Sequence, residues 1–203
     1  MFKRHCITIN YLNGNSDIEY LLFVDADMGI INPRHRIEDY IDPKYDMLFY
    51  ERIYDYEIVA GSFLINDWEG VFDYVACARS LLNDRLIFGK IKVLSKKSRS
   101  SWARDGWLTN STWSPKDFIL HGWKSIFLDQ PGFAMWTTPF VPHVKFRLSQ
   151  CDSYANPFKD WKYKPDVKRS DKDIEKKLNN ISMRVRKEYN IRLKRIWNNP
   201  LLS

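Results

Sequence analysis

The chain has 203 residues, of which 44% are hydrophobic and 28% charged, and its net charge at pH 7 is +7. This composition excludes a wholly disordered chain and provides enough apolar residues for one hydrophobic core. Three cysteines without a C-x-x-C pair exclude a disulfide-stapled mini-protein and a structural zinc site of paired cysteines. Apolar runs such as Tyr20–Val24 fall short of the about 20 residues of a membrane span, and Met1–Cys6 does not begin a signal peptide. We therefore expect no transmembrane segment in this chain.

The positive charge is concentrated at the C-terminal end. From residue 159 onward there are 14 Lys and Arg against 6 Asp and Glu, whereas residues 1–158 are close to neutral. A basic tail is typical either of a solvated helical extension or of a segment that binds nucleic acid or an acidic membrane surface. Because residues 1–158 carry no such excess, we expect no nucleic-acid partner for the main body.

The first 65 residues predict three strands and one helix. The short apolar run Leu21–Val24, closed by turn residues, is typical of a buried strand. Asn32-Pro33 resembles a helix start, with Asn as the cap and Pro in the first turn. The apolar face of that helix would consist of Ile37, Tyr40 and Ile41. Two further strands are predicted over Asp46–Tyr50 and Ile58–Ile65.

Residues 68–127 predict a helix followed by two strands. Apolar residues recur at helical spacing over Trp68–Leu82. The alternation over Ile87–Leu94 predicts one strand, and Lys96–Ser101 reads as a polar loop. The apolar run Phe118–Leu120 predicts another short strand, which ends at His121.

The last third of the chain predicts an irregular segment and a long helix. Five prolines interrupt the segment after residue 127, whereas Lys168–Trp197 has an apolar stripe at steps of three and four residues. The stripe consists of Ile174, Leu178, Ile181, Val185, Tyr189, Leu193 and Ile196. Alternating strands and helices predict an α/β layered domain over residues 1–127, a Pro-rich wrap over 128–167 and a basic helical tail over 168–203.

The clearest chemical motif is Asp25-Ala26-Asp27, which follows the predicted strand Leu21–Val24. Two carboxylates one residue apart can bind one hard divalent cation, Mg²⁺ or Mn²⁺, that keeps positions open for phosphate oxygens. In open α/β sheets, ligands also collect beyond the carboxyl ends of the strands. A solvated turn explains the same residues. A phosphatase with Asp25 as nucleophile is a further reading, although Met28-Gly29-Ile30 matches its motif poorly.

Two other groups are candidates for the site. His121, at the end of a predicted strand, is either a structural imidazole or a metal ligand, and Lys124 three residues later can meet phosphate as a compact positive charge. The segment Trp102–Thr109 offers indole faces for a sugar and Arg104 for phosphate or hydroxyls. Packing explains its tryptophans equally well, because indoles bury a large area. The carboxylates of Asp55, Glu57 and Asp105 have no partner that the sequence identifies.

Several of these motifs, taken in order, resemble a nematode family of uncharacterised glycosyltransferase-like proteins over about residues 1–127. The segments that carry the resemblance are Phe2–Cys6, Leu22–Pro33, Ile37–Asp42, Phe49–Arg52, Tyr56–Ser62, Phe88–Leu94, Trp102–Thr109 and Trp113–Lys124. More remotely, the family is similar to galactosyl- and mannosyltransferases with a nucleotide-diphospho-sugar-binding (GT-A-like) α/β fold.

The resemblance implies a metal-dependent transfer of a hexose from a nucleotide-sugar donor to a glycan or glycoprotein acceptor. In that fold the D-x-D motif holds Mn²⁺ against the donor diphosphate, and a His near the end of the domain completes the set of metal ligands. The resemblance therefore implies Asp25, Asp27 and His121 as ligands of Mn²⁺ or Mg²⁺. Lys124 and Arg104 would then contact the donor, and Trp102 and Trp107 the acceptor. The family resemblance also implies the Golgi lumen or the secretory pathway, and the N-x-S/T patterns at Asn110 and Asn180 would fit a luminal protein.

Two parts of the family pattern are not found in the chain. Only 24 residues precede Asp25, too few for the βαβ units that bind base and ribose. An insert with a His-Gly-Thr-Asp-Asn-Gly-Ala-like motif is expected after Ala60–Ser62, but the chain continues directly into Asn66-Asp67. We therefore expect a partial, truncated transferase domain. The alternative is a non-catalytic remnant or interaction protein of the same fold.

Overall fold

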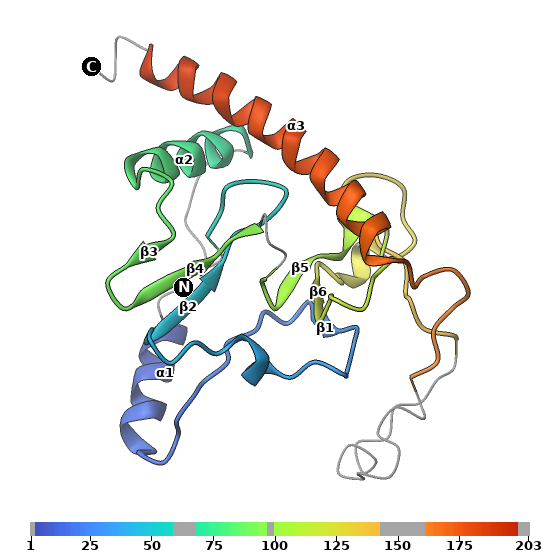
Figure 1. Ribbon diagram of the computed structural model, residues 1–203, viewed down its shortest axis with the longest axis horizontal. Coiled ribbons are helices and arrows are strands. Elements are labelled where there is room, and N and C mark those ends of the chain that lie inside the picture. The colour runs from blue at the N-terminus through green and yellow to red at the C-terminus, as the bar shows by residue number, and fades with distance from the viewer. Residues whose placement is uncertain (1–2, 59–67, 97–99, 143–160, 199–203) are drawn as a thin grey trace.

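The computed structural model of the chain describes residues 3–58, 68–96, 100–142 and 161–198. These form a mixed α/β structure with two small sheets and a long C-terminal helix (Figure 1). The helices are α1 (Lys3–Gly14), α2 (Trp68–Leu81) and α3 (Asp171–Trp197), with short 3-10 turns η1 (Ile37–Tyr40), η3 (Gly106–Thr109) and η4 (Ser125–Phe127). The strands are β1 (Met28–Ile30), β2 (Met47–Tyr50), β3 (Ile87–Phe88), β4 (Ile91–Leu94), β5 (Ala103–Asp105) and β6 (Ile119–His121).

The first sheet has the order β1-β6-β5 and is mixed. Its central strand β6 pairs antiparallel with β1 and parallel with β5. The register places His121 opposite Met28 on one side and opposite Asp105 on the other. The strand predicted at Phe118–Leu120 is therefore confirmed, shifted by one residue, and it is the element that organises this sheet.

The second sheet has the order β2-β4-β3 and corrects one prediction. The strand predicted over Asp46–Tyr50 is confirmed as β2, but Ile87–Leu94 is a hairpin of β3 and β4 rather than one strand. Gly89 lies at the turn with φ of +58°. Glycine has no Cβ and accepts this left-handed conformation without strain, which allows the chain to reverse there.

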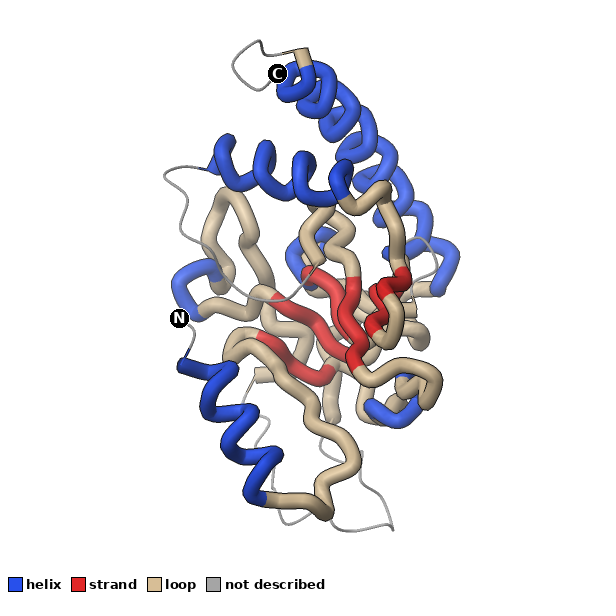
Figure 2. Tube along the Cα trace, turned by 90° about the vertical axis from the view of Figure 1, so that its left-hand side faces the viewer, coloured by secondary structure: helices blue, strands red, loops and turns tan. Residues whose placement is uncertain are grey.

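Helices α2 and α3 pack against each other on one side of the strands, and α1 lies at the opposite end (Figures 1 and 2). The apolar stripe predicted for the C-terminal helix is confirmed: its residues are buried or half-buried. The helix begins at Asp171 rather than Lys168, because the Ser170 hydroxyl accepts a hydrogen bond from the Asp173 backbone N–H (3.1 Å) and caps it. Asp73 of α2 pairs with Arg192 and Arg195, so part of the basic charge of α3 is neutralised within the molecule.

Two predictions near the N-terminus are wrong. Leu21–Val24 is not a strand, and its four side chains are 41–53% exposed. The strand forms instead after the D-x-D motif, at β1, where β6 supplies the backbone partner. The helix expected after Asn32-Pro33 is only the turn η1, although the Asn32 side-chain oxygen accepts the Arg34 backbone N–H (3.3 Å) as a helix cap does. The Asn32 amide nitrogen donates to the Pro115 carbonyl (2.9 Å).

The remaining predictions are partly confirmed and partly fall on residues that the structure does not describe. Helix α2 is confirmed within one residue, whereas α1 was not anticipated. The strand predicted over Ile58–Ile65 lies almost wholly outside the described residues, apart from a single bridge between Ile58 and Glu51. The described part of the Pro-rich segment, residues 128–142 and 161–167, has isolated bridges and turns but no helix or strand. Among the described residues, no helix has the length and apolar character needed to span a bilayer. The three domain boundaries stay predictions.

Candidate metal centre

The candidate centre lies at the end of β6, where the sheet register brings three predicted ligands together. Asp25–Met28 forms a tight turn in which the Met28 N–H donates to the Asp25 carbonyl (3.1 Å). The Asp27 carbonyl accepts hydrogen bonds from the backbone N–H groups of Gly122 (3.0 Å) and Trp123 (2.9 Å). These bonds continue the β1–β6 ladder past its last pair and hold the D-x-D turn beside His121.

The side chains of Asp25, Asp27 and His121 converge. Each offers one ligand atom, and the three atoms all lie within 4.8 Å of one another. The Nε2 atom of His121 is 3.3 Å from Oδ1 of Asp27. Two carboxylate oxygens and one imidazole nitrogen are a donor set that suits Mn²⁺, Mg²⁺ or a related divalent ion.

The second ring nitrogen of His121, Nδ1, contacts a buried carboxylate. Nδ1 of His121 is 2.9 Å from Oδ1 of Asp105, a residue only 2% exposed on the neighbouring strand β5. Arg52 donates from Nε and Nη2 to both oxygens of Asp105 and from Nη1 to Glu57 (3.0 Å). A carboxylate that accepts the Nδ1 proton fixes the tautomer in which Nε2 is free to bind a metal.

The charges around His121 shift two pKa values. Burial alone would raise the pKa of Asp105, but Arg52 and the hydrogen bond from His121 outweigh it and lower the pKa to about 2. Burial lowers the pKa of His121, but the hydrogen bond and charge of Asp105 outweigh it, Asp27 adds to their effect, and the net shift is upward. Asp105 is therefore a fixed negative charge, and His121 lies between it and the D-x-D carboxylates.

Asp27 shows an unused acceptor. Its Oδ2 atom is buried and accepts no hydrogen bond from any residue in the described part of the chain. The Lys124 ammonium is 3.9 Å away, beyond hydrogen-bond distance, and its side chain is 56% exposed. A buried carboxylate oxygen without a hydrogen bond is costly, so it marks a position where a cation would be favoured.

Arg104, predicted to contact the donor, lies on β5 but does not face this cluster. It is 6% exposed and donates to both oxygens of Asp117 (2.7 and 2.9 Å), to Thr109 and to the carbonyls of Asp105 and Thr112. All three guanidinium nitrogens are thus engaged. A phosphate contact would require breaking this buried pair, and a donor-binding role for Arg104 stays a prediction.

The other predicted residues lie in different surroundings. Trp102 is 8% exposed and packs edge-on against Tyr50 in the core, which favours packing as its role. Trp107 is half-buried beside Gly122, where a Cβ atom would come within 3.1 Å of its ring. Asn110 and Asn180 are both exposed, and their glycosylation stays a prediction.

The sequence did not reveal the residues that support His121. The sequence identifies no partner for Asp105 and Glu57, yet both pair with Arg52, for which it predicts no role. One signal was present: Asp105 directly follows Arg104 in a segment rich in tryptophan, where two adjacent charges are expected to be paired if buried.

Comparison with known families now places the chain. A family model described as "Protein of unknown function, DUF273" matches residues 1–69 and 65–133. The chain belongs to this family. Searches of curated proteins and of solved structures gave no match. In this DUF273 protein all three candidate ligands, together with Arg52 and Asp105, lie within the matched residues, and α3 lies beyond them.

Proposed function

We propose that this DUF273 protein binds a divalent cation, Mn²⁺ or Mg²⁺, through Asp25, Asp27 and His121, and with it the diphosphate of a nucleotide-sugar donor. The observation that carries the proposal is the convergence of these three ligand atoms within 4.8 Å from segments far apart in the sequence. The Oδ2 atom of Asp27, which is buried and accepts no hydrogen bond from the described residues, and the Asp105 carboxylate on the other side of His121 support it independently.

The proposed reaction is transfer of a hexose to a glycan acceptor. A bound divalent ion would neutralise the charge that develops on the departing diphosphate. Asp25 and Asp27 would hold the ion, Asp105 would keep Nε2 of His121 in the ligating tautomer, and Lys124 would add a mobile positive charge for the phosphates. The resemblance of the D-x-D and His motifs to GT-A-like transferases supports the choice of a nucleotide sugar.

A second candidate function is a non-catalytic protein that keeps the cation site. One observation favours it: Leu21–Val24 is exposed, whereas in a donor-binding α/β fold the strand before D-x-D is buried between neighbours. Such a protein would bind the cation but not a nucleotide diphosphate.

Calorimetric titration with MnCl₂, alone and with uridine or guanosine diphosphate, separates these functions. The proposal expects Mn²⁺ binding that strengthens with the nucleotide, and a loss of at least about 100-fold in Asp27→Asn because a ligand charge is removed. Asp129→Asn, an exposed residue outside the cluster, is the matched control and should bind as the parent does.

Each contrary result has one meaning. Binding of Mn²⁺ without any nucleotide binding favours the non-catalytic candidate. Absence of Mn²⁺ binding, or diphosphate binding that is unchanged in Asp27→Asn, contradicts the metal centre itself.

A further inference from the structure

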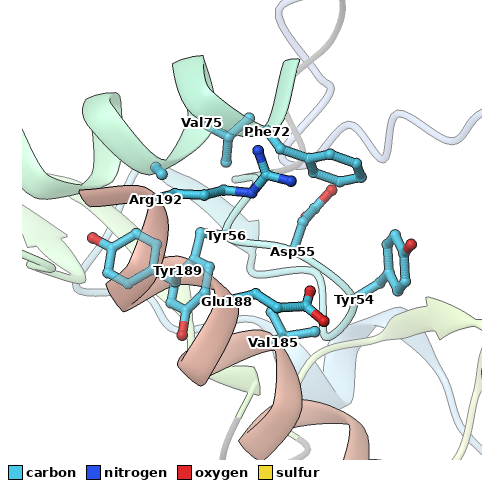
Figure 3. A pocket seen from close by; sticks show the side chains of 10 residues that line it. Tyr54, Asp55, Tyr56, Phe72, Val75, Val185, Glu188, Tyr189 and Arg192 are labelled. Atoms are coloured by element: carbon cyan, nitrogen blue, oxygen red, sulfur yellow. The ribbon is translucent and has the colours of Figure 1, made fainter. Parts of the chain in front are cut away.

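A cavity of about 310 Å³ lies between α2, α3 and the segment Tyr54–Tyr56 (Figure 3). It is separate from the D-x-D cluster, and none of the ligand candidates lines it. Its volume is at the small end of the range of about 300–1,000 Å³ found for ligand pockets, which suits an occupant of about one ring.

The cavity wall combines aromatic rings with charged groups. Figure 3 shows the carboxylates of Asp55 and Glu188 and the guanidinium of Arg192 around a space bordered by the rings of Phe72 and Tyr54. The two rings are 6.0 Å apart and inclined by 65°, so they form a corner rather than a stacked pair. The Arg192 guanidinium lies over the Phe72 ring, 5.2 Å from its centroid, and an apolar ring in the cavity would pack on the remaining aromatic surface of this corner.

The polar groups of the cavity are held but not saturated. Oδ1 of Asp55 accepts the Glu57 backbone N–H (2.9 Å), and Oδ2 accepts no hydrogen bond from the described residues. Glu188 is only loosely paired with Arg184, at 3.9 Å, and its side chain is 59% exposed. Burial raises the pKa of Asp55 although Arg52 opposes the shift, as expected of a carboxyl group short of donors.

The charge balance of the wall selects against ionic occupants. Two carboxylates against one guanidinium disfavour a phosphate or a carboxylate ligand. Positive groups lie at the same wall: Arg192 lines the cavity, and Arg186 lies over the lining rings of Tyr56 and Tyr189, so a simple cation is disfavoured as well. An uncharged polyhydroxy ring satisfies both carboxylates as a donor and packs its C–H face on the aromatic corner.

The cavity adjoins the candidate metal centre through one side chain. The ring of Tyr54 contacts Trp107 with centroids 4.7 Å apart, and Trp107 packs against Gly122, the residue after His121. The Trp107 side chain would therefore be the group that separates a ligand in the cavity from the metal centre.

We propose that the cavity between α2, α3 and Tyr54–Tyr56 binds one uncharged hexose residue, which is the acceptor end of a glycan. Its identification as the acceptor rests on the proposed transferase function, whereas binding of the sugar does not. Asp55 and Glu188 accept hydrogen bonds from ring hydroxyls, and Tyr54 and Phe72 pack against the ring.

The test uses the full chain and saturation-transfer difference NMR. The probes are methyl glycosides of glucose, galactose, mannose and N-acetylglucosamine, with open-chain sorbitol and tetramethylammonium as controls. We expect saturable binding of at least one glycoside and of neither control. Glu188→Gln should weaken it about tenfold, because a charge-assisted hydrogen bond is lost, and Glu175→Gln on the same helix should not.

The outcomes separate this inference from the proposed function. No saturable glycoside binding, equal affinity in Glu188→Gln and Glu175→Gln, or preference for tetramethylammonium overturns the sugar site. The same samples are titrated with Mn²⁺, which Glu188→Gln should leave unchanged. Glycoside binding without Mn²⁺ binding keeps the sugar site and removes the acceptor role together with the transferase function.

Discussion

The adjacent β5 residues Arg104 and Asp105 each belong to an arginine–aspartate pair, and the two pairs differ in one respect. Arg104 pairs with Asp117, and every nitrogen of its guanidinium has a partner within the protein. Asp105, the next residue, pairs with Arg52, but its chain of contacts continues through His121 to Asp27 and ends at an oxygen that accepts no hydrogen bond from the described residues. Successive residues of a strand face opposite sides, so the two systems are separate.

The difference shows how a structural charge cluster is distinguished from a candidate site. A buried ion pair with all its hydrogen bonds made has nothing left to bind. A network that ends on an acceptor without a hydrogen bond, next to two more ligand atoms, can still bind a cation. The comparison predicts that the first system governs stability and the second governs metal affinity.

The largest effect is expected from Arg104→Met. Removing one partner leaves the Asp117 carboxylate buried and should lower the free energy of unfolding by about 3–5 kcal/mol in urea denaturation. Lys116→Met, an exposed neighbour, is the control and should change stability by less than about 0.5 kcal/mol. A similar small change in Arg104→Met would contradict the structural role of the pair.

Disturbing the second system, the Asp105–His121–Asp27 network, should change metal affinity. Asp105→Asn removes the charge that orients His121 and should weaken Mn²⁺ binding about 10–100-fold, measured by calorimetry on protein shown to be folded by circular dichroism. Asp46→Asn, an exposed carboxylate, should bind Mn²⁺ as the parent does. Unchanged affinity in folded Asp105→Asn would rule out this residue as the positioning group of His121.

The register that joins β1 to β6 can be disturbed without touching a charge. A Cβ atom at Gly29 would lie 2.0 Å from the Trp123 ring, which stacks on Trp136. Gly29→Ala should therefore displace the indole, lower stability by about 1–3 kcal/mol and change tryptophan fluorescence. Gly14→Ala has no atom within 4 Å of the new Cβ and serves as control. Equal stability of the two variants would show that this packing does not hold the register.

The smallest effect concerns Lys96, a buried charge with partial compensation. Its ammonium donates to the Asp55 carbonyl (2.8 Å) and lies 3.7 Å from the Tyr56 ring centroid, yet burial lowers its pKa to about 8. Between this value and the ordinary 10.5, the unfolded chain binds the proton and the folded chain does not, so stability rises with pH. Relative to Lys96→Met, the parent should gain about 1 kcal/mol or more from pH 8 to 10.5. A stability difference that is constant over this range would contradict the shift.

Local pattern predicted the elements that depend on their own residues. The 3.6-residue period gave α2 and the buried stripe of α3, and short apolar runs gave β2 and β6. Prediction failed where the structure of a segment depends on pairing with another segment or on a turn. Leu21–Val24 has strand composition but no strand paired with it among the described residues, and Ile87–Leu94 alternates like one strand although Gly89 turns it into two.

The sequence by itself determined the chemical kinds at the candidate site: two acidic residues in a turn, an imidazole after a strand and a nearby lysine. Only the tertiary structure decided that Asp105, paired with Arg52, binds Nδ1 of His121, and that Arg104 is engaged by Asp117. It also decided that Trp107 separates the metal centre from a cavity lined by aromatic rings. The physical reason is the range of the forces involved. Propensity and periodicity act over a few neighbouring residues, whereas hydrogen-bond register and the mutual burial of charges are set between strands that the chain visits far apart.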